Sequence, residues 1–147
     1  LLSLRLEKSF GIWSAEFTQG YTAGQTGMDR WIDWDKGDFV GRDAAIKERD
    51  GNGPAQVVVT LKVDAADADA SGYEPVWSGG ERVGFVTSGG YGHTLGQSFA
   101  MAMVNREVAA EGSTLSVHIV GVERPATVIA ASPYDAKGNA MRGRPVT

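Results

Sequence analysis

The distribution of glycine constrains the fold of this chain more than any other feature of the sequence. Glycine accounts for 20 of the 147 residues, nearly double its average share of about 7%. The glycines fall in pairs and short clusters between apolar runs, which is the spacing of turns between short β-strands. The sequence therefore predicts a mainly β protein with many tight turns.

Five segments carry the pattern of a strand. Residues 56–63 alternate between aliphatic and polar side chains, as a half-buried strand requires. The other four candidates are residues 82–88, 98–104, 114–120 and 126–131. Turn signals separate them at intervals of roughly 8 to 15 residues, which favours a small antiparallel barrel or sandwich.

One segment reads as an α-helix, at residues 42–50. It has Ala44, Ala45 and Ile46 inside it and Gly51 directly after it, where helices favour a C-terminal glycine. The following Gly-Asn-Gly-Pro at residues 51–54 is the strongest boundary in the chain. We therefore expect an α+β chain in two parts: an irregular, aromatic-rich part at residues 1–54, then an antiparallel β-barrel-like domain at residues 55–147.

Three segments fit this pattern less clearly. Residues 1–10 match a helix face and a strand face, and periodicity cannot decide so short a run. Residues 31–39 are aromatic and charged, and we expect an edge strand and turn there, with Trp31 and Trp34 packed as core. Residues 64–71 are acidic and alanine-rich without an apolar face, which indicates a surface loop.

Composition narrows the function classes. The chain is 42% hydrophobic and 22% charged with a net charge of -4, values typical of a globular domain and unlike a nucleic-acid binder. No apolar run approaches the roughly 20 residues of a bilayer helix. We therefore expect neither a membrane nor a nucleic acid as partner. The absence of cysteine excludes disulfides and thiolate sites and fits a reducing compartment, so we expect a cytoplasmic protein, with the mitochondrial matrix left open.

Glu7 is the first candidate for specific chemistry. It follows Leu6 and lies between the cations Arg5 and Lys8. One interpretation is a solvated glutamate paired with either cation. The other is a carboxylate that accepts two parallel hydrogen bonds from a planar donor pair, such as guanidinium or the amino-amide edge of a pterin or guanine. The residues alone leave both interpretations open.

The two histidines do not indicate a catalytic or metal site. His93 lies near Ser88, but no nucleophile elbow surrounds that serine and no orienting acid is evident. His118 falls on the polar phase of its strand candidate, so we expect it to be exposed. The glycines around position 90 precede a strand and not a helix, so they do not form a dinucleotide fingerprint. They favour tight turns and a close approach of strands.

Three motifs in order resemble the aminomethyltransferase (glycine cleavage T-protein) superfamily. LRLEKSFG at residues 4–11 is similar to its LRLE segment, and DKGDFVGR at residues 35–42 to its DKGDFIGK/R segment. GFVTSGGYGHTL at residues 84–95, followed by SFAMA at residues 98–102, resembles its GxxTSGxxSxxLxxxIA motif. The GGYGHT variant is most similar to the folate-linked C-terminal portions of dimethylglycine and sarcosine dehydrogenases.

The resemblance implies a fragment of a tetrahydrofolate-dependent one-carbon transfer enzyme. In the family, folate captures a one-carbon unit from an amine, and the LRLE glutamate, here Glu7, holds the pterin edge. Lys36 and Arg142 are then expected near the glutamate tail of the folate. Residues 1–54 would be the end of the folate-binding region and residues 55–147 the family's C-terminal barrel.

The resemblance also implies partners in the same polypeptide. The chain begins at Leu1 without methionine, inside a patterned segment, so we expect upstream domains. The family's catalytic aspartate would lie there, and we expect no catalytic residue in this chain. The methylated amine substrate would also bind there, and a flavin (FAD) domain would precede Leu1 in the dehydrogenase type.

One departure from the family keeps two alternatives open. The family's TPxEAGL segment reads TAGQTGM at residues 22–28, without its proline and glutamate. The chain could belong to a binding or regulatory module that kept the shape without the transfer chemistry. It could also be a structural module that supports or oligomerises a neighbouring domain.

Overall fold

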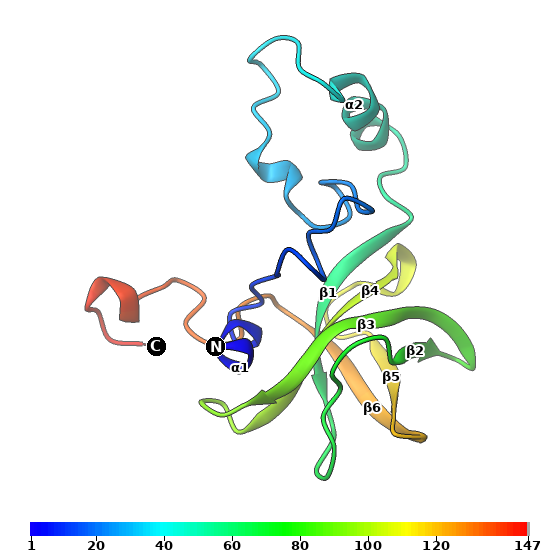
Figure 1. Ribbon diagram of the computed structural model, residues 1–147, viewed down its shortest axis with the longest axis vertical. Helices are drawn as coiled ribbons and strands as arrows, with labels where there is room; N and C mark the ends of the chain where they lie inside the picture. Colours follow the sequence, from blue (N-terminus) through cyan, green and yellow to red (C-terminus); the bar gives the residue numbers. More distant parts are fainter. Residues whose placement is uncertain (147) are drawn as a thin grey trace.

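The computed structural model describes residues 1–146, and its centre is a closed antiparallel β-barrel of six strands (Figure 1). The strands are β1 (Gln56–Val63), β2 (Pro75–Ser78), β3 (Glu81–Gly92), β4 (Gln97–Asn105), β5 (Thr114–Ile119) and β6 (Val122–Ile129). They pair in the order β1-β4-β3-β2-β5-β6. The predicted fold class, mainly β with a short helix before an antiparallel barrel, is confirmed. Thr147, the last residue of the second predicted part, lies outside the described residues.

Strand β4 shows how the sequence builds the barrel. Its residues Ala100, Ala102 and Val104 belong to the core inside the barrel, whereas Phe99 and Met101 belong to a second cluster outside it. This alternation follows the two-residue period of a strand. Small side chains on the inner face suit a narrow closed barrel, in which facing strands lie close together. Gly84 of β3 serves the same purpose, because a Cβ there would collide with the Met103 carbonyl.

Helix α1 (Leu2–Leu6) resolves the ambiguity of residues 1–10 in favour of a helix. It is a single turn, too short to be stable by itself. Leu6 is 2% exposed and packs in the outer cluster with Phe99 and Met101. Burying a leucine side chain contributes about 1.5 to 3 kcal/mol, so the barrel wall, and not helix propensity, holds α1 in place.

Helix α2 (Arg42–Asp50) has the predicted bounds. Its end differs in one detail, because Gly51 has a φ of -86° and the left-handed conformation occurs at Gly53, with a φ of 69°. Three short 3-10 helices complete the chain: η1 (Asp29–Trp31), η2 (Arg106–Val108) and η3 (Ala140–Arg142).

Three expectations about the remaining segments need correction. No strand forms at residues 31–39, and Trp31 is 73% exposed. Strand β2 was not anticipated, because it has four residues, begins with proline and pairs irregularly with β3. Residues 64–71 do form a loop, but Ala70 is buried in the barrel core, so the loop does have an apolar side.

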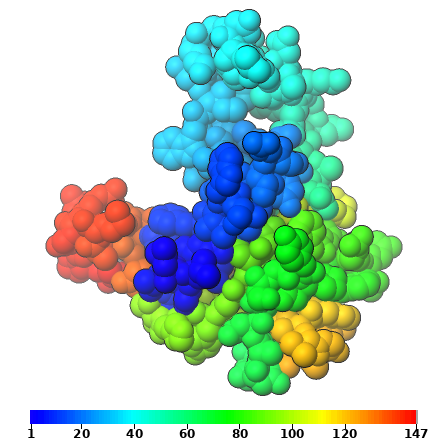
Figure 2. All heavy atoms as spheres, in the orientation of Figure 1, coloured from blue at the N-terminus to red at the C-terminus, as the bar shows by residue number. Residues whose placement is uncertain are grey.

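Two segments project from the barrel. Residues 11–55 form an upper lobe that carries α2, and residues 130–146 form a C-terminal arm that carries η3 (Figure 1). Within residues 8–55, Glu16 is the one buried residue, so the upper lobe has almost no core. The space-filling view shows a hollow between the upper lobe and the C-terminal arm (Figure 2). Among the described residues, no helix is long and apolar enough to cross a bilayer.

Candidate ligand-binding site

The carboxylate of Glu7 is buried, and its two oxygens have different surroundings. Glu7 is 1% exposed. Its Oε1 accepts hydrogen bonds from the backbone N–H groups of Thr94, at 2.7 Å, and Leu95, at 3.0 Å. Oε2 accepts no hydrogen bond from residues 1–146. It is not one of the described side-chain atoms that are sealed from solvent without a partner. Oε2 therefore keeps a small contact with solvent and has no partner among the described residues, whereas Oε1 already accepts two hydrogen bonds.

The two ends of the chain hold Glu7 in place together. The backbone N–H of Tyr134 donates to the carbonyl of Glu7 at 2.9 Å. Lys8 Nζ donates to the carbonyls of Tyr134 and Asp135, and Ser132 Oγ donates to the carbonyl of Lys8 at 2.7 Å. The C-terminal arm thus fixes the residues that directly follow α1.

The structure excludes the interpretation of Glu7 as a solvated glutamate paired with a neighbouring cation. Arg5 pairs instead with Glu16, with 3.3 Å between Nη1 and Oε2. Lys8 is bound to the C-terminal arm by main-chain carbonyls. Both cations next to Glu7 in sequence therefore have other partners, and no arginine occupies its carboxylate.

Glu16 is a second buried carboxylate, which the sequence did not indicate. It is 0% exposed and accepts hydrogen bonds from the N–H of Ile12, at 2.9 Å, and from the hydroxyl of Ser88. With Arg5 it joins α1, the upper lobe and β3 in one polar network. The segment around Glu16 has no periodicity, so no sequence pattern pointed to it. The hydroxyl of Ser88 serves this network, which agrees with the absence of a nucleophile elbow.

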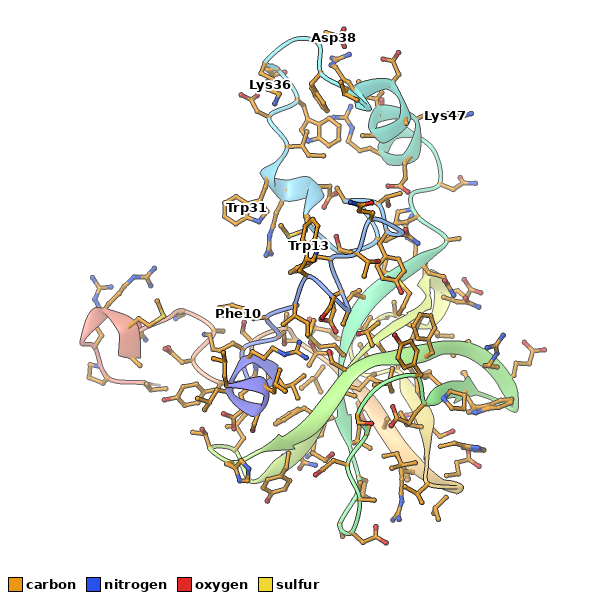
Figure 3. The ribbon with its side chains drawn as sticks, viewed as in Figure 1. Phe10, Trp13, Trp31, Lys36, Asp38 and Lys47 are labelled. Carbon is orange, nitrogen blue, oxygen red and sulfur yellow. The ribbon has the colours of Figure 1, made fainter. Side chains whose placement is uncertain are left out.

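Lys36 and Arg142 make no hydrogen bond to this network within the described residues. Lys36 is exposed at the tip of the upper lobe (Figure 3), with its Nζ 4.8 Å from the centre of the Phe39 ring. Arg142 is exposed in the C-terminal arm, where its Nη1 donates to the carbonyl of Lys137. The structure does not bring Glu7, Lys36 and Arg142 together. It places them in three regions, α1, the upper lobe and the C-terminal arm.

Arg142 also has an anion nearby, Asp135. Burial raises the pKa of Asp135, but the N–H groups of Asn139 and Ala140 and the charges of Lys8 and Arg142 outweigh burial, so this pKa lies below its usual value. The charge of Arg142 is therefore partly offset before any ligand arrives. An anionic ligand at Arg142 would have to compete with this carboxylate.

An aromatic strip lies beside the site. Phe10, Trp13 and Trp31 are 57%, 72% and 73% exposed. In Figure 3 they follow one another from Trp31 in the upper lobe through Trp13 to Phe10 near α1. We call these three residues the aromatic strip, because large apolar side chains that gather on one surface are a feature of interaction sites.

The histidines contribute to local packing. The rings of Tyr91 and His93 meet edge to face at 5.2 Å. His118 is half-exposed on β5, with Nε2 3.6 Å from Glu123 Oε2. Within residues 1–146, no group of three or more His, Cys, Asp or Glu side chains could hold a metal ion.

Comparisons with known proteins all match one family. The family model for the glycine cleavage T-protein C-terminal barrel domain matches residues 56–135. The chain is 35% identical over 130 residues to the mitochondrial dimethylglycine dehydrogenase of Rattus norvegicus, covering 88% of this chain and 15% of that protein. It is 38% identical over 136 residues to an aminomethyltransferase of Streptomyces coelicolor, covering 90% of this chain and 36% of that protein. The chain thus spans well under half the length of these relatives.

A solved structure supports the fold. The crystal structure of glycine cleavage system aminomethyltransferase T from Bartonella henselae superposes with a TM-score of 0.81. The alignment covers 89% of this chain and 37% of that one, at 24% sequence identity.

Proposed function

The chain belongs to the family of the glycine cleavage T-protein C-terminal barrel domain, and from this membership we propose that it binds and orients tetrahydrofolate in a one-carbon transfer enzyme. Its relatives include aminomethyltransferases and dimethylglycine dehydrogenases. The observation that carries the proposal is the buried carboxylate of Glu7, with one oxygen anchored to the backbone and the other without a partner among residues 1–146.

The donor set of a pterin fits this carboxylate. The pterin edge offers a ring N–H and an amino group, and a carboxylate only accepts hydrogen bonds. Oε1 already accepts two, so the proposed contact is made by Oε2, which has two free lone-pair positions. The proposed contact through Oε2 alone differs from the arrangement expected from the sequence, in which each carboxylate oxygen accepts one of two parallel hydrogen bonds. The bound cofactor would supply N5 as the acceptor of the one-carbon unit, and this chain would supply orientation.

Lys36 and Arg142 remain proposals as contacts of the folate glutamate tail. Both side chains are exposed. Long, flexible cations that attract an anion through water contribute little, commonly about 0 to 1 kcal/mol. We therefore assign most of the specificity to Glu7 and only attraction to these two residues.

The proposal includes further domains of a longer polypeptide. The relatives are much longer than this chain, and the aromatic strip offers an apolar surface for such a domain. The catalytic aspartate, the methylated amine and, in the dimethylglycine or sarcosine dehydrogenase type, FAD would belong there. We propose the cytoplasm as the location, and the mitochondrial matrix as the alternative because one relative is named as mitochondrial.

The variant Glu7→Gln tests the proposal sharply. Its amide oxygen can still accept from Thr94 and Leu95, because the amino group would face two donors in that position. The amino group therefore takes the position of Oε2 and meets the ligand donors. We expect affinity for folinic acid to fall by about 1.5 to 3 kcal/mol, the value of a hydrogen bond to a charged group.

The measurement is calorimetric titration of folinic acid into the complete gene product. Glu81→Gln is the matched control, because Glu81 is exposed at the start of β3. Equal affinities for the wild type and Glu7→Gln would remove Glu7 from the folate site.

The altered segment at residues 22–28 favours a second candidate, a non-catalytic binding, regulatory or structural module. This segment is closed by its own hydrogen bonds, since Gln25 Oε1 accepts from the N–H of Thr22 and Thr26 Oγ1 donates to the carbonyl of Thr22. The test supplies the complete gene product with tetrahydrofolate, secondary or tertiary methylamines and an electron acceptor, because oxidation of the methyl group to the methylene level releases two electrons. Formation of methylenetetrahydrofolate would exclude the non-catalytic alternative.

A further inference from the structure

We propose that Gly92, together with the β3–β4 turn at residues 93–96, is a positioning residue that sets where the Glu7 carboxylate lies. The inference rests on the proposed role of Glu7 in folate binding. It gives a function to the GYGHTL segment, whose glycines the sequence indicated as residues for tight turns and a close approach of strands. The structure shows two independent contacts from this segment to Glu7.

The first contact is a close approach that only glycine allows. Gly92 is buried, and a Cβ added there would lie 2.7 Å from two carbons of the Phe99 ring and 2.9 Å from Cγ of Glu7. Gly92 does not have a left-handed φ, in contrast to Gly96 with 64°. The requirement for glycine at position 92 is therefore steric, and it comes from the Glu7 side chain on one side and the Phe99 ring on the other.

The second contact is the pair of backbone hydrogen bonds. Gly92 pairs with Gln97 across the strands, so residues 93–96 form the turn, and two of its N–H groups bind Oε1 of Glu7. Two donors from successive residues fix both the position of Oε1 and the plane of the carboxylate. Because Oε1 is held, the direction of Oε2 is fixed as well.

These two contacts belong to one rigid unit. The turn closes a hairpin of two long strands, and β4 is buried along almost its whole length. A change at position 92 would displace the stem of Glu7 while the turn amides still held its end. A binding carboxylate must keep its geometry within about 0.5 Å, so even a single methyl group at this position is expected to disturb the ligand contact.

The experiment is a double-mutant cycle on the complete gene product, with titration of folinic acid. The variants are Glu7→Gln, Gly92→Ala and the two combined. Gly20→Ala is the matched control, because Gly20 lacks a left-handed φ and a Cβ there would meet only Thr18 Oγ1, at 3.6 Å. We expect Gly92→Ala to weaken binding about tenfold or more. In the Glu7→Gln background the same substitution should change affinity by less than about twofold.

The outcomes separate this inference from the proposed function. An unchanged affinity in Glu7→Gln would overturn the folate role of Glu7 and this inference with it. A loss in Glu7→Gln without a loss in Gly92→Ala would overturn this inference alone. Equal losses from Gly92→Ala in both backgrounds would also overturn it, because they would show a general effect on the fold.

A second variant keeps the inference testable if Gly92→Ala does not fold. Gly92→Ala with Phe99→Leu removes the ring from one side, so the remaining collision is with Glu7. We expect this double variant to fold and still to bind folinic acid about tenfold more weakly than Phe99→Leu alone. Equal affinities for those two proteins would contradict the positioning role.

Discussion

At the scale of single residues, two buried serine hydroxyls differ in whether they have a hydrogen-bond partner. The Ser88 hydroxyl donates to Glu16, a carboxylate that is 0% exposed. The Ser98 hydroxyl is equally enclosed, because Ser98 is 1% exposed, and its Oγ has no partner among residues 1–146. Two serines on neighbouring strands thus have opposite energetic roles.

This contrast gives a paired prediction. Ser88→Ala removes a donor from a buried carboxylate, so we expect it to lower the free energy of unfolding by about 1 to 3 kcal/mol. Ser98→Ala removes a hydroxyl that gains nothing from burial, so we expect it to be neutral or stabilising. Denaturant titration of both variants measures the difference. Equal destabilisation would show that Ser98 has a partner, such as a buried water molecule.

The sequence could indicate Glu7 but not Glu16. Glu7 stands in a recognisable motif between two cations, and its chemistry follows from its residue type. Its surroundings did not follow, because its partners Thr94 and Leu95 are distant in the chain and contribute backbone atoms, which no side-chain pattern reveals. Glu16 has neither a motif nor a period, so only the folded arrangement identifies it.

At the scale of the elements, the β5–β6 hairpin carries an exposed acid–base cluster. Ser116 Oγ donates to Glu123 Oε1 at 2.6 Å, and His118 lies on the other side of the same carboxylate. The hydrogen bond from Ser116, opposed by burial and aided by His118, holds the pKa of Glu123 below its usual 4.5. A lowered pKa of a carboxyl means that its contribution to stability is present above the ordinary value and is lost as the pH falls through the folded value.

The expected result of Ser116→Ala follows from the downward direction of the Glu123 pKa shift. Loss of the hydroxyl should raise the pKa of Glu123 toward 4.5 and reduce the loss of hairpin stability below that pH. Carboxyl NMR titration of Glu123 measures the shift directly. Ser78→Ala is the control, because Ser78 lies outside the hairpin on β2. An unchanged Glu123 pKa in Ser116→Ala would show that His118 supplies the effect.

The elements that the sequence predicted well are those with a clear local pattern, whether in the barrel or outside it. Strand β1 and helix α2 have the predicted bounds, and β3 extends four residues beyond the predicted end at residue 88. Residues 31–39 failed because aromatic side chains were taken as core. In the structure these rings lie next to cations instead, with Arg49 4.4 Å from the centre of the Trp34 ring and Arg30 5.6 Å from that of Trp31.

At the scale of the whole molecule, the barrel is well packed and the upper lobe is not. Helix α2 has no buried residue, whereas the barrel holds nearly all of the core. The sequence indicates a division near residue 54, and that division remains a prediction. The hollow beside the aromatic strip (Figure 2) could not be anticipated in this way, because the orientation of the lobe depends on interactions between distant segments.

The aromatic strip predicts different behaviour in the chain alone and in a longer protein. Trp31 is 73% exposed, so we expect Trp31→Ala to leave the melting temperature of this chain nearly unchanged. In the complete gene product the same change should lower it by about 2 to 4 °C for each kcal/mol that burial of the indole contributes there. Calorimetry on both proteins tests this, with Val122→Ala on the barrel as the control. Equal shifts in the two proteins would contradict a docking role.

The hydrogen bonds between the C-terminal arm and the residues after α1 make the two ends of this chain depend on each other. Tyr134 supports the main chain of Glu7, and Lys8 is held by carbonyls of the arm. A premature stop codon or trimming by an exopeptidase that removed the whole arm would leave every strand intact. It would nevertheless remove the hydrogen bonds that support the main chain at Glu7 and the side chain of Lys8, so loss of one terminus would loosen the other.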